Sequence, residues 1–221
     1  MTHGLTCSRV ELHAWDAHSD DHIERLRLQR LACGWGEASL PRWQRWTDEG
    51  RMLMFWVSLP RDDPHRQNVE ARQLAAYPQQ ASTLTDPDGV SFLPIGHVAL
   101  YLIDEDEDMS LHDPAGGRVV KIAALYISTA VQGQRLGSSA MDAIEARAAT
   151  SPLSCSVVLL DTLPDAVIAA ERAKDGKPMA AVSNEQWYIR RGYKFYGYRN
   201  RQTSENPPRL LEFVLMKKHL K

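Results

Sequence analysis

The alternation of apolar and polar positions along the chain predicts the order of its strands and helices. Short stretches alternate with the period of two expected for a half-buried strand, whereas others place apolar residues three and four positions apart, as an amphipathic helix does. Ser, Asp and Asn stand before several helical stretches and glycines after them, as caps do. The pattern predicts strands over residues 8–15, 51–59, 92–103, 117–128, 154–163, 193–199 and 209–218, and helices over 19–35, 39–50, 164–176 and 183–193, with one more after Gly137.

One stretch in the first half of the chain shows little periodicity. Residues 60–91 are rich in Pro, Asp, Gln and Ser, and too little apolar sequence precedes them to fold alone. We therefore expect a long polar insertion within one domain that spans 1–221. The two strands that follow it read as an antiparallel hairpin whose tip carries the acidic run 104–108, a charge block that is usually only solvated but could attract a cationic substrate.

Hairpins and crossover connections both occur in this order of elements, so the fold class is predicted as α/β (α+β). We expect a mixed, largely antiparallel central sheet of about seven strands with helices on both faces.

Composition excludes several function classes. The formal net charge is −2 and the pI is near 6.4, which lacks the basic footprint of a nucleic-acid partner. No apolar run approaches the ~18 residues of a membrane span, and the N-terminus has no secretory pattern, so a soluble, cytoplasmic protein is expected. The cysteines and the early histidines have no metal-ligand spacing, so reduced thiols and no metal are expected; these residues are Cys7, Cys33, Cys155, His13, His18 and His22.

The chemistry of the chain centres on a glycine-punctuated turn between a strand and a helix. The strand ends at Ser128, and Gly133 and Gly137 lie in the turn before the helix. Backbone N–H groups at a helix start are unpaired and lie at the positive end of the helix dipole, so such a turn suits a phosphate. Neither G-x-G-x-x-G nor G-x-x-x-x-G-K-[ST] is present, so the turn is a different kind of phosphate site.

The segment Gln132-Gly133-Gln134-Arg135-Leu136-Gly137 resembles the [RQ]-x-x-G-x-[GA] pattern of the GNAT superfamily of acetyl-CoA-dependent N-acetyltransferases, with Arg135 at the usual middle glycine. The resemblance implies that amides of this loop bind the diphosphate of coenzyme A, with added contact from the arginine, and that the preceding strand binds the pantetheine arm and the thioester carbonyl. The implied cofactor-binding residues are Leu125, Tyr126, Ile127, Gln132, Gly133, Gln134, Arg135, Leu136, Gly137, Ser138 and Asn184.

A second segment extends the resemblance. The sequence WYIRRGY at 187–193 looks like the family's FYxxxGF signature, which places Tyr188 as general acid for the departing thiolate. The general base is open: Asp161, at the end of a neighbouring strand, is the first candidate, with His97, Glu212 or a water chain as alternatives.

The resemblance implies an N-acetyltransferase in which an amine attacks acetyl-CoA directly. A non-catalytic acyl-CoA-binding module of the same fold is the alternative, and a protein-interaction domain that has lost the coenzyme is a weaker one. The amine acceptor is not identified by the sequence, and a homodimer is left open. Four tryptophans fall where the family binds its acceptor, although core packing is their commoner use; they are Trp35, Trp43, Trp46 and Trp56.

Overall fold

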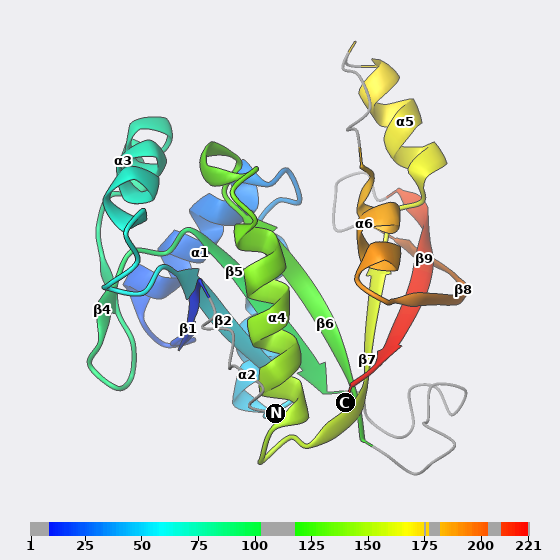
Figure 1. Ribbon diagram of the computed structural model, residues 1–221, viewed down its shortest axis with the longest axis horizontal. Coiled ribbons are helices and arrows are strands. Elements are labelled where there is room, and N and C mark those ends of the chain that lie inside the picture. Colours follow the sequence, from blue (N-terminus) through cyan, green and yellow to red (C-terminus); the bar gives the residue numbers. More distant parts are fainter. Residues whose placement is uncertain (1–8, 103–117, 175, 177–181, 203–208, 221) are drawn as a thin grey trace, which may run out of the picture.

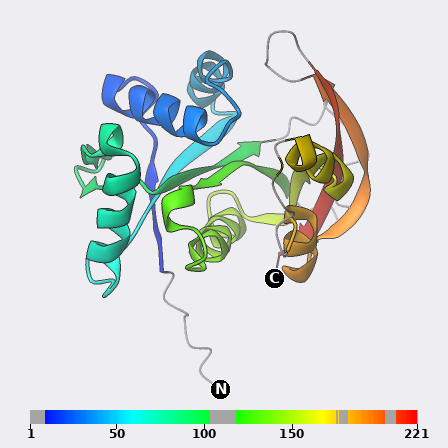
Figure 2. The same ribbon diagram turned by 90° about the horizontal axis from the view of Figure 1, so that it is seen from above.

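The computed structural model of the protein describes residues 9–102, 118–174, 176, 182–202 and 209–220. Helices cover both faces of a central sheet (Figures 1 and 2). The strands are β1 (Glu11–Ala14), β2 (Met52–Ser58), β3 (Leu84–Thr85), β4 (Ser91–Phe92), β5 (Gly96–Leu102), β6 (Arg118–Ile127), β7 (Cys155–Thr162), β8 (Lys194–Gln202) and β9 (Leu210–His219). The helices are α1 (Asp20–Ala32), α2 (Leu40–Asp48), α3 (Arg66–Ala76), α4 (Leu136–Ala149), α5 (Asp165–Lys174) and α6 (Asn184–Arg190), with 3₁₀ turns η1 (Pro78–Gln80) and η3 (Thr129–Val131).

The central sheet, within the described part of the chain, has seven strands in the order β1-β2-β5-β6-β7-β9-β8. Its neighbouring strands pair antiparallel except for β6 and β7, which are parallel and are joined by the crossover helix α4. The predicted mixed, largely antiparallel sheet with helices on both faces is confirmed.

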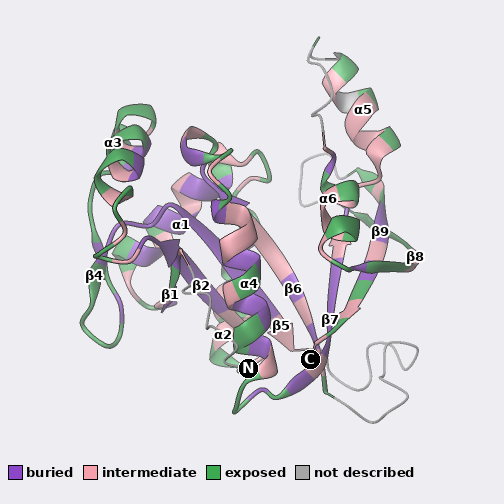
Figure 3. Ribbon diagram, in the orientation of Figure 1, coloured by how far each residue is buried: buried purple, intermediate pink, exposed green. Residues whose placement is uncertain are grey.

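Each face of the sheet buries its own apolar cluster, because successive side chains of a strand point to opposite faces. On β2, Trp56 joins the cluster formed with α1 and α2, whereas Val57 joins the cluster formed with α4. Buried residues therefore concentrate in the central strands and in the inner side of α4, while β8 and α3 are largely exposed (Figure 3). No helix among the described residues is long and apolar enough to cross a membrane.

Strands β6 and β7 separate partway along their length. They pair only from Arg118 to Lys121 on β6, opposite Cys155 to Leu159 on β7. Beyond that point β6 pairs with β5 alone and β7 with β9 alone. The sheet opens into a V that is visible between the two strands in Figure 1, and no strand among the described residues pairs there with the edge of β6 that faces this opening.

The segment 60–91, which is expected to be a long polar insertion with little periodicity, contains regular structure. It contains α3, η1 and the short β3–β4 pair. The helix was missed because its buried positions are Val69 and Gln73, and a polar side chain in the inward stripe hides the helical period. Gln73 Nε2 donates to Gln80 Oε1 at 3.1 Å within the segment, so a side-chain bond replaces part of the apolar contact.

The strand expected over 92–103 is divided in the structure. Phe92 pairs with Leu84 in the small sheet, and β5 begins only at Gly96. Pro94 lies between them and has no N–H to donate to a strand ladder, which accounts for the interruption. The acidic run 104–108 lies outside the described residues.

Candidate functional site

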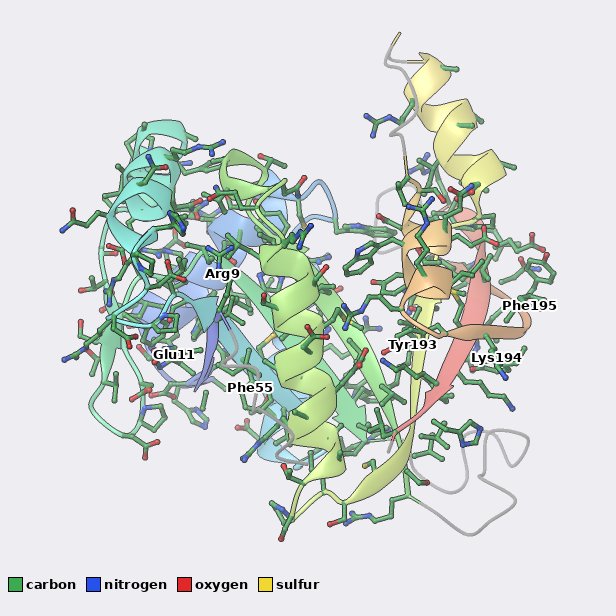
Figure 4. The ribbon with its side chains drawn as sticks, in the orientation of Figure 1. Arg9, Glu11, Phe55, Tyr193, Lys194 and Phe195 are labelled. Carbon is green, nitrogen blue, oxygen red and sulfur yellow. The ribbon has the colours of Figure 1, made fainter. Side chains whose placement is uncertain are left out.

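Side chains donate hydrogen bonds to three backbone carbonyls in and just before the loop between η3 and α4. Gln132 Nε2 donates to the carbonyl of Ile127 at 2.9 Å, and Gln134 Nε2 donates to the carbonyl of Val131 at 3.4 Å. Arg9, labelled in Figure 4, donates from Nη1 to the carbonyl of Gln134 at 3.2 Å. With these carbonyls held, the amides from Gln132 to Ser138 donate no hydrogen bond to any residue in the described part of the chain.

Two residues of this loop have left-handed backbone conformations. Gly133 has φ +83°, which costs a glycine little. Arg135, the residue just before α4, has φ 63° and ψ 11°, a region that costs a residue with a Cβ roughly 1–2 kcal/mol. The arginine thus adopts the backbone that a glycine would take freely, while its side chain is exposed.

The remaining loop residues differ in how deeply they are buried. Leu136 is buried in the cluster beside α4, so only its amide can reach a ligand. Gly137 and Ser138 are half-buried in the first turn of α4. A Cβ built on Gly137 would lie 3.9 Å from Ile127 Cγ1 and 4.0 Å from Trp187 Cζ2, which is ordinary contact, so the protein itself would accommodate an alanine there.

The two segments that carry the family resemblance come together at the opening. Trp187, on α6, reaches the first turn of α4 at Gly137. Helix α6 begins after Ser183, whose Oγ accepts from the amide of Gln186 at 3.1 Å. Asn184, the other expected site residue here, is exposed at the start of α6, and its side chain has no partner among the described residues.

Tyr188 is half-buried against the cluster beside α4, with its ring centroid 4.9 Å from that of Trp187 and 5.6 Å from that of Tyr193. Burial, and secondly the negative charge of Asp161, raise the pKa of Tyr188 to about 12. Its hydroxyl makes no hydrogen bond to any residue that the structure describes. A protonated hydroxyl without a partner is therefore present near Asp161 at neutral pH.

At the end of β6 the side chains are buried or half-buried, so this part of the strand can offer a ligand mainly its backbone groups. Tyr126 and Ile127 are buried, and Leu125 is half-buried against the core beside α4. Burial raises the pKa of Tyr126 to about 12. Ala124 has φ +52° at a β-bulge, where the pairing with β5 shifts. This bulge was not expected from the sequence, and bulges commonly occur next to active sites because they redirect the chain.

Asp161 lies on β7 at the point where the two strands separate, and two cations contact it. Lys121 Nζ, from β6, is 2.5 Å from Asp161 Oδ2, and Arg201 Nη1, from β8, is 3.7 Å from the same oxygen. Sequence reasoning missed both cations. For Lys121 a signal existed, since it is the one charged residue of the apolar stretch 119–127.

The other two base candidates lie in unsuitable places. His97 is fully buried, its Nδ1 is 2.7 Å from Gln29 Oε1, and burial lowers its pKa to about 3. Glu212 is exposed and points to the opposite face from Asp161, because Leu215 is the residue paired with Asp161 and side chains alternate along β9. Asp161 is the candidate whose negative charge raises the pKa of Tyr188.

The four tryptophans differ in their surroundings. Trp43 and Trp56 are buried in the cluster with α1 and α2, and Trp46 packs against it. Trp35, between α1 and α2, is 41% exposed, and its ring centroid lies 6.4 Å from that of Phe213 on β9. Trp35 therefore spans the two halves of the sheet on the face that bears Asp161.

The described residues contain no group of three or more His, Cys, Asp or Glu side chains that could hold a metal ion. Cys33 and Cys155 are free thiols, and Cys7 lies outside the described residues.

Comparisons with known proteins agree with this geometry. The acetyltransferase (GNAT) family profile matches residues 43–173. The fold is similar to that of Arabidopsis thaliana NAA60 in complex with a bisubstrate analogue (TM-score 0.59, 12% identity, 96% of this chain and 99% of that chain) and with acetyl-CoA (0.58, 12%, 96% and 98%). It is also similar to a spermidine N-acetyltransferase SpeG chimera from Vibrio cholerae and hSSAT (0.52, 12%, 96% and 96%). No curated protein sequence matches significantly. The profile match covers more than half of the chain, which therefore belongs to the acetyltransferase (GNAT) family.

Proposed function

We propose that this protein is an N-acetyltransferase that transfers the acetyl group of acetyl-CoA to a primary amine by direct attack. The observation that carries the proposal is the meeting of Gly137 and Trp187 at the opening between β6 and β7. Near this opening the amides of the loop and the hydroxyl of Tyr188 have no hydrogen-bond partner among the described residues. The acetyl-CoA and the bisubstrate analogue in the two Arabidopsis structures are in keeping with this reading.

The loop residues fit a diphosphate. The amides from Gln132 to Ser138 are free to donate, they lie at the positive end of α4, and the exposed Arg135 side chain adds a permanent positive charge. Gly137 leaves space beside Trp187. The unpaired edge of β6 beyond Lys121 can hydrogen-bond an extended amide-bearing chain, as a missing strand would. Acetyl-CoA bound in this way would supply the acetyl group as a thioester.

The residues at the opening account for the proton transfers. Attack forms a C–N bond, breaks the C–S bond, releases one proton from the amine and requires one at the sulfur. Tyr188 remains protonated at neutral pH and would donate to the sulfur. Asp161 Oδ1 has no partner among the described residues, since both cations contact Oδ2, and it would accept the proton of the amine directly or through water.

A second candidate is a non-catalytic acyl-CoA-binding module of the same fold. It is favoured by the engagement of Asp161 with Lys121, which makes this carboxylate part of an ion pair as well as a candidate base. The two candidates differ in whether thiol is released and not in whether coenzyme A binds.

The test is thiol release from acetyl-CoA with a panel of primary amines, for the wild type and Tyr188→Phe. General acid catalysis contributes about 10²- to 10⁴-fold, so the variant should lose kcat by that range while its affinity for coenzyme A, measured by calorimetry, is kept. Tyr198→Phe is the matched control, because Tyr198 is an exposed tyrosine on β8. Coenzyme binding without thiol release on any amine would support the binding module instead, and a Tyr188→Phe variant as fast as the wild type would remove the role of the tyrosine.

A further inference from the structure

Cationic side chains gather around Asp161 on the face of the sheet that carries α1 and α2. Lys121 and Arg201 both contact its Oδ2 atom. Arg199 is paired with Phe213 across β8 and β9, and directly opposed residues of an antiparallel pair point to the same face. Phe213 lies beneath Arg201, whose guanidinium is 4.7 Å from the ring centroid, so Arg199 and Arg201 share one face of β8.

Helix α2 contributes another cation from the opposite side of the opening. The guanidinium of Arg42 lies 4.8 Å from the ring of Trp46. The ring of Trp46 lies 4.8 Å from that of Tyr101 on β5, and Tyr101 is paired with Lys121 of β6, so Arg42 lies on the surface that bears Lys121, Asp161 and Arg201. In keeping with this placement, burial, and secondly the charge of Arg201, lower the pKa of Arg42. Figure 2 shows the β8–β9 pair curving toward the side of the sheet on which α2 lies. Arg42 has no hydrogen bond or ion pair with any residue in the described ranges.

The nearby carboxylates that belong to the described residues do not balance these charges. Glu49 is engaged by Arg45 and Arg51, and Glu37 by Arg27. Glu212 points to the other face of β9. Among the described residues Asp161 is thus the one carboxylate that contacts Lys121 and Arg201, while Arg42 and Arg199 have no carboxylate partner.

We propose that the amine acceptor carries a carboxylate close to its amino group, and that Arg42 and Arg201 bind this carboxylate. The inference rests on the proposed transferase function and names the class of its acceptor. Each of the two guanidiniums lies over an aromatic ring, so its N–H groups point past the ring. Arg201 Nη1 already contacts Asp161, and the other N–H groups of the two arginines can make the two-pronged contact with a carboxylate that arginine favours. Trp35, which is 41% exposed and packs beside Phe213, offers an apolar surface for the rest of the molecule.

The same charges have a consequence for reactivity. A nearby positive charge disfavours a protonated amine, and the attacking amine has to be neutral. A polycationic acceptor would meet repulsion at the same place, so amino acids are favoured over polyamines as the acceptor class.

The experiment compares kcat/KM for thiol release from acetyl-CoA with phenylalanine, phenylalaninamide, phenethylamine and spermidine. A charge-assisted hydrogen bond contributes about 1.5–3 kcal/mol, so phenylalanine should exceed its amide by about tenfold or more. The amino group of the amide is the weaker base and is neutral to a larger extent, so intrinsic reactivity works against this result. The preference should shrink in high salt, because exposed charges are screened.

Single substitutions test whether Arg42 and Arg201 cause the preference for phenylalanine over phenylalaninamide. Arg201→Gln and Arg42→Gln should each lower the ratio of phenylalanine to phenylalaninamide by about tenfold and leave the KM for acetyl-CoA unchanged. Arg147→Gln is the matched control, since Arg147 is exposed on α4 on the opposite face, and its ratio should equal that of the wild type.

The outcomes separate the two proposals. Equal or faster turnover of phenylalaninamide or spermidine would keep the transferase and overturn the anionic acceptor, as would an unchanged ratio in Arg201→Gln and Arg42→Gln. If no amine releases thiol, calorimetry of phenylalanine with the protein, with and without coenzyme A, decides: binding that Arg201→Gln weakens supports the carboxylate site without turnover, and absence of binding overturns it.

Discussion

Lys121 Nζ and Asp161 Oδ2 lie 2.5 Å apart across the point at which β6 and β7 separate. Both side chains are mostly buried, with 16% and 13% of their surface exposed. An ion pair in this setting does more than a surface pair, because removing one partner leaves a poorly solvated charge. The pair joins the two halves of the sheet below the opening in which the proposed chemistry takes place.

A double-mutant cycle tests this pair. Lys121→Met and Asp161→Asn should each lower the free energy of unfolding, and the double variant should lose less than their sum, with a coupling of about 1–3 kcal/mol. Urea unfolding of the four proteins gives the value. In Lys121→Met, Arg201 is the remaining cation that contacts Asp161. A coupling near zero would show that the ion pair with Lys121 does not stabilise the folded protein.

Gly96 allows β5 to approach the end of β6. A Cβ built there would lie 2.2 Å from the carbonyl oxygen of Tyr126, a backbone atom that cannot move without shifting the strand. Gly96→Ala should therefore cost about 2–4 kcal/mol of unfolding free energy and weaken coenzyme A binding, because β6 leads into the loop. Gly197→Ala is the control, since its nearest atom is Leu215 Cδ1 at 3.9 Å. Equal stabilities of the two variants in urea would contradict the close approach.

Substitutions of Arg135 test separately the strain of its backbone conformation and the charge of its side chain. Arg135→Gly should unfold at the same urea concentration as the wild type or at a higher one, because a glycine adopts φ 63° without the cost of a Cβ, about 1 kcal/mol or more. Arg135→Ala keeps the strain and should show no gain. Both variants lack the guanidinium and should bind coenzyme A more weakly, by calorimetry, than Arg135→Lys. Tight binding by the glycine variant would show that the arginine side chain does not reach the phosphates.

Because His97 is buried, we expect the free energy of unfolding of the protein to fall in acid. Its pKa is about 3 in the folded protein, against an ordinary value of 6.5, so the unfolded chain binds a proton first as pH falls. The stabilisation is complete above about pH 6.5 and is lost toward pH 3, at about 1.4 kcal/mol per pH unit. Urea unfolding across this range should show a shallower slope for His97→Gln than for the wild type. Identical slopes would mean that another group causes the acid sensitivity.

Local signals sufficed for most of the elements and for the two segments on which the candidate site is placed. Ser183 and Gly192 mark the two ends of the α6 segment, and the pattern around Gly133 and Gly137 predicted a strand, a turn and a helix. The insertion helix α3 was missed because Gln73 occupies its buried stripe. The bulge at Ala124 was missed because a positive φ at alanine leaves no mark in the sequence.

The sequence by itself determined the order of elements, the turn with free amides and the tyrosine that follows it, since each depends on residues close together in the chain. Only the tertiary structure decided that Asp161 is bound by Lys121 and Arg201, and that Arg42, over Trp46, lies on the same surface. The physical reason is that an ion pair or a repulsion depends on a few ångströms between side chains from different strands and helices. Which strands lie side by side, and where two of them part, is decided by the packing of the whole sheet.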